Sequence, residues 1–225
     1  MKRENYCLLE NFMLSCMEDS AHDKEHVYRV LYNALEIAGT ESNVDYDVLI
    51  GACLLHDIGR REQFENPALC HAMVGAEKAY HFLLEQGFET EYAQQVKHCI
   101  QTHRYRKSNL PQSMEAKILF DADKLDVAGA IGISRTLIYK GIVSEPLYSV
   151  LADGTVSDGE GDTAPSFFQE YKYKLENIYS NFYTAKAAQM AEERRHIAVE
   201  FYQSLYREVN SSYQNGRDKL DRLLR

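Results

Sequence analysis

A nearly continuous apolar stretch reads VLIGACLLHDIG over residues 48–59. Because apolar side chains fall on almost every side of a helix with this sequence, the stretch predicts a central helix that is buried all round. Its last turn carries two adjacent polar groups, His56 and Asp57, before Gly59 favours a stop. Burying both groups there is costly unless they are paired or bind a metal.

The sequence on either side has helical periodicity as well. Apolar residues recur three and four positions apart, and Asp45 or Asp47 can cap the central helix. The ranges predicted to be helical are 5–18, 24–38, 71–86, 90–103, one helix from Ser113 through 133, and one or two long helices within 166–212. Residues 61–70, 104–111 and 152–163 are predicted to be loops, and the polar tail 215–225 is predicted to fray.

Composition favours one helical domain. The chain has 225 residues, 45% of them apolar, which is enough for a sizeable core. Four prolines and twelve glycines are few for a loop-rich all-β fold. We therefore expect a compact all-α bundle formed by a single domain over 1–225, with its core at about 20–140 and C-terminal helices at about 165–215 packed on that core.

Charge and cysteine usage limit the classes of function. A formal net charge of -9 argues against nucleic acid as a partner. Five cysteines, an odd number without a CxxC pair, are typical of reduced thiols. No signal-peptide core and no run of 18 apolar residues is found, so we expect a cytoplasmic protein without a membrane partner.

Three separated segments carry groups that suit a divalent metal. They are His26, the pair His56–Asp57, and the acidic cluster DADKLD at 121–126. Imidazole and carboxylate ligands together suit first-row divalent metals and, with more oxygen ligands, magnesium or manganese. Spacing alone is a weak signal, because an isolated HD dipeptide is usually a helix-end pair. Indeed, His22–Asp23 is a second one in this chain.

The wider sequence resembles a known family. The segments DKEHVYRVLYNALEIA (23–38), LIGACLLHDIGRRE (49–62) and ILFDADKLDVAGAIGI (118–133) are similar, in content and order, to the HD superfamily of metal-dependent phosphohydrolases. The LLHDIG core is the most specific of these. The later segment SFFQEYKYKLENIYSNFYTAKAAQMAEERR (166–195) resembles a bacterial single-domain subgroup that includes nucleotide pyrophosphohydrolases. This resemblance implies one HD-type domain over 1–225.

The resemblance implies a set of metal ligands. His26 matches the first histidine of the family motif, and His56 and Asp57 match the pair that names it. The last ligand usually follows a small residue and precedes a basic one, which selects Asp123, with Asp121 as the alternative. Asp126 is a candidate for contact with the metal through water. The metal can be Mg, Mn, Fe, Co, Ni or Zn.

Further residues are candidates for contact with substrate. His71 and His103 fall where two-metal members of the superfamily keep extra histidines, and His98 is a weaker candidate. We favour a single ion, with His71 and His103 reserved for phosphate or water. Candidate phosphate-binding cations are Arg29, Arg60, Arg61, Lys124, Arg104 and Arg106, with Lys174, Arg194 and Arg195 as weaker matches; Tyr171, Tyr173 and Tyr179 are candidates for stacking on a base.

The expected activity is metal-dependent hydrolysis of a phosphoanhydride or phosphoester of a nucleotide, above all that of a nucleoside triphosphate pyrophosphohydrolase. A bound divalent ion would lower the pKa of water and polarise a phosphoryl oxygen. The alternatives are a nucleoside monophosphatase, a dinucleoside polyphosphate hydrolase, a cyclic-nucleotide phosphodiesterase, or a non-catalytic nucleotide- or metal-binding module. The expected partner is a small phosphorylated substrate, and a homodimer is possible.

Overall fold

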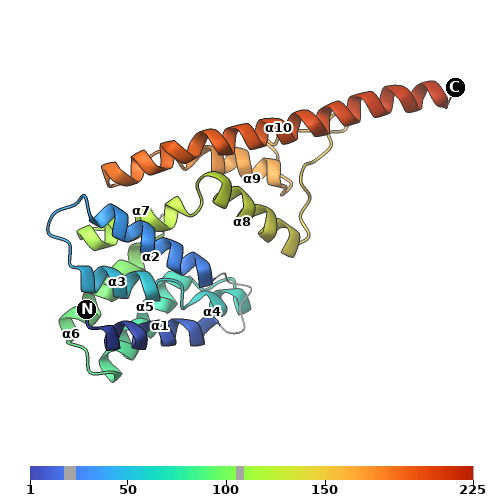
Figure 1. The fold of residues 1–225 in the computed structure, drawn as a ribbon. Coiled ribbons are helices and arrows are strands. Elements are labelled where there is room, and N and C mark those ends of the chain that lie inside the picture. The colour runs from blue at the N-terminus through green and yellow to red at the C-terminus, as the bar shows by residue number, and fades with distance from the viewer. Residues whose placement is uncertain (18–23, 105–108, 225) are drawn as a thin grey trace. The chain divides into compact units, whose positions relative to one another are not determined.

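The computed structural model describes residues 1–17, 24–104 and 109–224, and Figure 1 shows the order of its helices. The chain divides into two compact units. Unit 1 contains Met1–Asp126 and Phe182–Ala187, and unit 2 contains Val127–Asn181 and Ala188–Arg225. Within the described ranges the structure has no β-strand, only one isolated bridge between Val150 and Val156. The prediction of an all-α fold is therefore confirmed.

Unit 1 is built around the apolar stretch. Its helices are α1 (Arg3–Met17), α2 (Lys24–Ala38), α3 (Tyr46–Leu55), α4 (Arg60–Glu65), α5 (His71–Glu85), α6 (Thr90–Thr102) and α7 (Met114–Leu125). α3 contacts α1, α2, α5, α6 and α7. Its residues from Val48 to Leu55 are buried, apart from the partly buried Ile50. The expectation of a central buried helix is confirmed.

Local chemistry sets the two ends of α3. The Asp45 carboxylate accepts hydrogen bonds from the backbone N–H groups of Asp47 and Val48, which makes Asp45 the N-cap. At the other end, a Cβ on Gly59 would lie 2.4 Å from the carbonyl oxygen of His71 and 2.6 Å from the backbone nitrogen of Gly75. Glycine at position 59 therefore allows the turn after α3 to lie directly against α5.

Two sequence-based boundaries are wrong. Residues 61–70 were expected to be a loop, but the structure has α4 at Arg60–Glu65. This short helix lacks an apolar stripe and is held by polar contacts, including Lys78 to Glu62 and Gln63 to the carbonyl of Leu69. The single helix predicted through residue 133 ends at Leu125, because the chain turns before Gly129, whose φ of 66° does not continue a helix.

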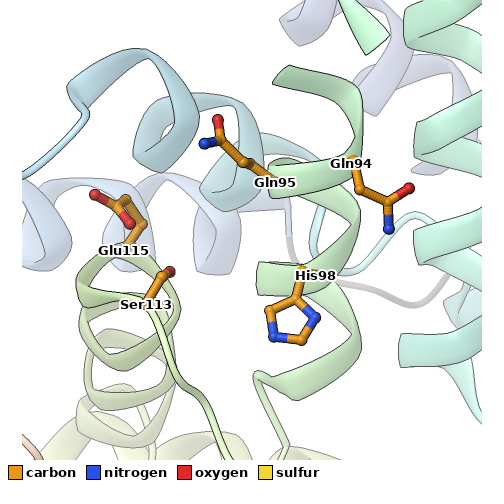
Figure 2. A pocket seen from close by; sticks show the side chains of 5 residues that line it. All are labelled: Gln94, Gln95, His98, Ser113 and Glu115. Carbon is orange, nitrogen blue, oxygen red and sulfur yellow. The ribbon is translucent and has the colours of Figure 1, made fainter. Parts of the chain in front are cut away.

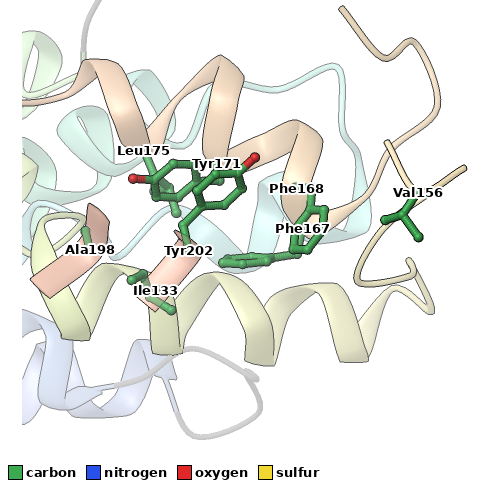
Figure 3. Packing of buried hydrophobic residues seen from close by; sticks show 8 residues of the cluster. All are labelled: Ile133, Val156, Phe167, Phe168, Tyr171, Leu175, Ala198 and Tyr202. Carbon is green, nitrogen blue, oxygen red and sulfur yellow. The ribbon is translucent and has the colours of Figure 1, made fainter. Parts of the chain in front are cut away.

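Unit 2 has an aromatic core. Its elements are α8 (Gly129–Ile142), α9 (Phe167–Tyr173), the 3-10 helix η1 (Leu175–Asn177) and most of α10 (Ala185–Leu223). Figure 3 shows the rings of Tyr171 and Tyr202 face to face, beside Phe167 and Phe168. The centroids of the two tyrosine rings are 4.0 Å apart. Helix α10 continues to Leu223, so the predicted fraying from 215 is wrong.

The acidic segment over 152–163 has no helix, as expected for a loop. That residues 165–215 pack back to complete one domain stays a prediction. None of the helices in the described ranges is both long and apolar enough to cross a membrane.

Candidate metal centre

Five helices of unit 1 bring metal-binding groups together at or near their ends. His26 lies in the first turn of α2, His56 directly follows α3, and His71 is the first residue of α5. His103 directly follows α6, and Asp123 lies in the last turn of α7. The four histidines are at most 3% exposed.

One group of donors consists of His26, His56 and Asp123, whose ligand atoms lie within 4.8 Å of one another. The Nε2 atom of His26 is 3.4 Å from Nε2 of His56 and 3.2 Å from Oδ1 of Asp123. The structure thus brings together three of the four predicted ligands, which come from the ends of α2, α3 and α7. The Asp123 side chain is 21% exposed, more than its two partners.

A second group consists of Asp57, His71 and His103, again within 4.8 Å of one another. Oδ1 of Asp57 lies 3.3 Å from Nε2 of His71 and 3.8 Å from Nε2 of His103. Its other oxygen, Oδ2, lies 3.5 Å from His26 and 3.7 Å from His56. Asp57 therefore stands between the two groups and presents one oxygen to each.

All four histidines are oriented through Nδ1. His56 Nδ1 lies 2.7 Å from the carbonyl oxygen of Cys53, and His103 Nδ1 lies 2.7 Å from that of Ile100. Because a carbonyl only accepts, both Nδ1 atoms carry the proton and both Nε2 atoms expose a lone pair. His71 Nδ1 lies 2.5 Å from Oε1 of Gln63.

The fourth histidine is held by a carboxylate. Asp126 Oδ2 lies 2.7 Å from Nδ1 of His26, and Arg29 donates from Nε to Asp126 Oδ1 at 2.7 Å and from a second nitrogen to Oδ2 at 3.1 Å. A carboxylate on the far nitrogen fixes the orientation of a metal-binding imidazole and raises its basicity. The Asp126 carboxylate therefore contacts His26, and Arg29, a predicted phosphate-binding residue, holds that carboxylate in place.

The donor set fits a divalent cation. Nε2 of His71 faces Nε2 of His103 at 3.3 Å, and two imidazole lone pairs at this distance repel one another unless a proton or a cation lies between them. Among the described residues, Oδ1 of Asp57 has no hydrogen-bond partner although it is buried. A buried carboxylate oxygen that accepts no hydrogen bond is costly. A cation bound by these groups would remove both penalties. The second group also supplies the donors for a second ion, in addition to the single ion favoured from the sequence.

The electrostatics of the cluster are strongly perturbed. Burial disfavours protonation of His26, but hydrogen bonds to Asp123, Asp126 and Asp57 outweigh it and raise the His26 pKa to about 10. Burial lowers the pKa of His71 to about 2 and that of His103 to about 4, so both rings are neutral at pH 7 and their Nε2 atoms are available as ligands.

The neighbouring carboxylates Asp121 and Asp123 face different partners. Asp121 accepts hydrogen bonds from the backbone N–H groups of Tyr183 and Thr184 and from the Thr184 hydroxyl, at 2.7–3.1 Å. It is fully buried and anchors the segment Phe182–Ala187 within unit 1. Asp123, by contrast, has its Oδ1 3.2 Å from Nε2 of His26, and its choice as the ligand stays a prediction.

The candidate cations have different surroundings. Arg60 Nε lies 3.0 Å from Asp57 Oδ1 without hydrogen-bond geometry, and its side chain is 31% exposed. Lys124 lies over the ring of Phe182 at 4.4 Å. Arg61 pairs with Glu65 on the surface of α4, and Arg104 Nη1 lies 3.8 Å from Sγ of Cys70. Arg106 and the dipeptide His22–Asp23 fall outside the described residues.

His98 does not join the cluster. Figure 2 shows it lining a separate pocket with Gln94 and Gln95 of α6 and with Ser113 and Glu115 at the start of α7. His81 is exposed on α5.

The weaker candidates lie in unit 2. Tyr171 is buried against the ring of Tyr202, and Tyr173 is exposed. The Tyr179 hydroxyl accepts a hydrogen bond from the backbone N–H of Gly129. The same unit contains the basic candidates Lys174, Arg194 and Arg195. A role of these residues at the metal centre stays a prediction.

Sequence reasoning missed two supporting residues. Gln63 orients His71 from a segment taken as a loop, and no local pattern marks it. Asp126 was considered only as a water-mediated ligand. Its position three residues after Asp123 does place it on nearly the same side of α7, but its pairing with His26 depends on how α7 packs against α2.

Comparisons with known proteins identify relatives that cover most of the chain. The HD domain family matches residues 24–128. YpgQ of Bacillus subtilis is 29% identical over 196 residues, which cover 85% of this chain and 86% of YpgQ. The crystal structure of YpgQ in complex with ADP is 25% identical, with a TM-score of 0.69 over 89% of this chain and 97% of that one.

A further solved structure ties the chain to a family. The crystal structure of a predicted HD-superfamily hydrolase from an uncultured Thermotogales bacterium is 30% identical, with a TM-score of 0.59, over 89% of this chain and 90% of that one. The helical fold, the convergence of the motif's histidines and aspartates, and this similarity along most of both chains all agree. The chain belongs to the HD superfamily of hydrolases.

Proposed function

We propose that the chain is a divalent-metal-dependent nucleoside triphosphate pyrophosphohydrolase. The observation that carries this proposal is the buried cluster of four histidines with Asp57 and Asp123, in which Oδ1 of Asp57 has no hydrogen-bond partner among the described residues. The crystal structure of the relative YpgQ with ADP supports a nucleotide as the ligand. The resemblance to a subgroup that includes nucleotide pyrophosphohydrolases supports cleavage of the bond that releases pyrophosphate.

The chain's own residues then divide the work. His26, His56 and Asp123 would hold one metal ion and His71 and His103 a second, with one oxygen of Asp57 towards each group. When bound, a divalent ion supplies water activation near neutral pH and stabilisation of phosphoryl charge. The Arg60 side chain is partly exposed beside the buried Asp57 and is placed to receive a phosphoryl oxygen, because guanidinium groups bind phosphate well.

The reaction balances without a covalent enzyme intermediate. Water adds to the α-phosphorus and loses a proton. The bond from that phosphorus to the bridging oxygen breaks, and pyrophosphate leaves with the bonding electron pair. The products are a nucleoside monophosphate and pyrophosphate, and no serine or cysteine nucleophile is needed.

One assay tests the proposal. The metal-reconstituted protein is incubated with a panel of nucleotides, and pyrophosphate is separated from orthophosphate. Pyrophosphate with an equimolar nucleoside monophosphate is the expected result, and Asp57→Asn serves as the inactive control for contaminating hydrolases. Orthophosphate alone would instead favour a phosphatase, and an absence of turnover with every nucleotide and metal would favour the non-catalytic binding module.

A further inference from the structure

Phe64 on α4 is exposed although it is a large apolar residue. It is 74% exposed, the highest value among the large apolar side chains described in unit 1. Its neighbour along the helix, Gln63, directly orients His71 of the metal centre. Single exposed apolar side chains are common on protein surfaces, so what singles out Phe64 is its place directly after the residue that orients a histidine of the metal centre.

The exposure of Phe64 does not come from a loosely attached segment. Gln63 Nε2 donates to the carbonyl of Leu69 at 2.9 Å. On another side of α4, the Lys78 ammonium binds the Glu62 carboxylate and donates to the carbonyl of Ile58 at 3.0 Å. These contacts fix the orientation of α4, and with it the direction in which Phe64 points.

Helix geometry places the ring at the rim of the site. Arg60 contacts Asp57 and Gln63 contacts His71, so these two residues define the side of α4 that faces the metal centre. On an ideal helix Phe64 lies about 40° from Arg60 and roughly one turn further along. Glu62, which packs towards α5, lies about 160° from Phe64. Position 64 therefore borders the site-facing side of α4, and its side chain is exposed to solvent.

The charges next to Phe64 suit a phosphate chain. Two cations lie near this side of the cluster, because Arg60 Nε is 3.0 Å from Oδ1 of Asp57 and Arg104 Nη1 is 3.8 Å from Sγ of Cys70, the residue before His71. A nucleotide whose phosphates reach the metal centre past Arg60 would bring its base to the next turn of α4. Base–aromatic stacking is tolerant of base identity, because every base has a π-face.

We propose that Phe64 is the platform on which the base of the nucleotide stacks. This inference rests on the proposed function in so far as the substrate is a nucleotide. It assigns to one residue the recognition of the base, separately from the metal and Arg60, which bind the phosphates.

The first test uses the absence of tryptophan from the chain. Phe64→Trp introduces a single indole, and its fluorescence is titrated with ADP and with inorganic pyrophosphate at saturating divalent metal. Quenching by ADP but not by pyrophosphate is expected. Tyr46→Trp, at the opposite end of α3 from the HD pair, is the matched control and should respond to neither. An indole at position 64 that does not respond to ADP when ADP is bound overturns the proposal.

The second test is kinetic. Phe64→Ala should raise KM for nucleoside triphosphates roughly five- to a hundredfold, the range that base stacking supports, with kcat nearly unchanged. The inhibition constant of inorganic pyrophosphate should stay the same, and Phe64→Tyr should restore KM. Glu65→Ala, an exposed neighbour on α4, is the control. An unchanged KM in Phe64→Ala, or a change only in oligomeric state, overturns the proposal.

The two proposals fail in different ways. If no nucleotide is hydrolysed but ADP still quenches the introduced indole, the base platform stands and the catalytic proposal fails. If triphosphates are hydrolysed to pyrophosphate but Phe64→Ala has the KM of the unmodified chain, the catalytic proposal stands and the platform fails.

Discussion

Gly59→Ala should displace the metal centre through the backbone. The added Cβ would lie 2.4 Å from the carbonyl oxygen of His71 and 2.6 Å from the nitrogen of Gly75. Real Cβ contacts essentially never fall below 3.0 Å, so α5 and the turn that carries residue 59 must separate by at least about 0.6 Å at His71. Both contacts are with backbone atoms, and no side-chain rotation relieves them.

The expected cost has two parts. Overpacking of this kind lowers the free energy of unfolding by about 1–3 kcal/mol. In addition, moving His71 separates its Nε2 from Asp57 Oδ1, which lies 3.3 Å away. Because a misplacement of about 1 Å can cost roughly a hundredfold in rate, we expect a large loss of turnover in the fraction of molecules that remains folded.

Urea denaturation and kcat/KM, measured on the same preparations, check this prediction. Gly75→Ala meets its nearest atom at 3.2 Å and should be milder, and Gly39→Ala, whose nearest contact is 3.5 Å, should change stability by less than about 1 kcal/mol. The reasoning is refuted if Gly59→Ala keeps the stability and turnover of the unmodified chain, or if the three variants do not follow this order.

The remaining predictions concern the ligands. Asp57→Ala should abolish turnover and most metal binding while far-UV circular dichroism stays unchanged; wild-type turnover would contradict the site. Asp123→Asn should resemble Asp57→Ala in metal content, whereas Asp121→Asn should mainly lower the thermal midpoint, and the reverse ranking would move the ligand to Asp121. Elemental analysis at saturating metal should find two ions per chain and the loss of one in His71→Ala; a single ion retained in that variant would restore the one-metal site. His26, with its pKa raised to about 10, carries a proton in the metal-free protein below that pH, so metal binding should release a proton and tighten as pH rises towards 10, as calorimetry in buffers of different ionisation enthalpy can measure.

Apolar periodicity predicted the helices that carry a buried stripe. The predicted range 24–38 coincides with α2, and the cap at Asp45 follows from local backbone chemistry, whereas α3 ends at Leu55, before the stop expected at Gly59. Helix α4 could not be predicted from apolar periodicity, because its contacts are polar and involve residues up to sixteen positions away. The helix break before Gly129 could not be predicted either, because the apolar pattern continues across it and only the positive φ of that glycine marks the turn.

For the site, the motif identified the residue types, but packing determines their partners. His26, His56 and Asp123 converge because three helix ends meet, which no spacing rule states. Arg29 and Lys124 were assigned to phosphate from their charge, and the structure places one on Asp126 and the other over Phe182. A cation on a helix pairs with whatever the neighbouring element presents, and that neighbour is known only once the fold is known.

The hydrogen bonds of Asp121 limit where the chain can be cut. The matched HD domain ends at residue 128 and the first stretch of unit 1 ends at Asp126, which invites expression of that part alone. Such a fragment would lack Tyr183 and Thr184 and leave a buried carboxylate without four hydrogen bonds, in the turn of α7 that also carries Asp123. A smaller active fragment would have to keep Phe182–Ala187 and rejoin it to Asp126 through a new linker.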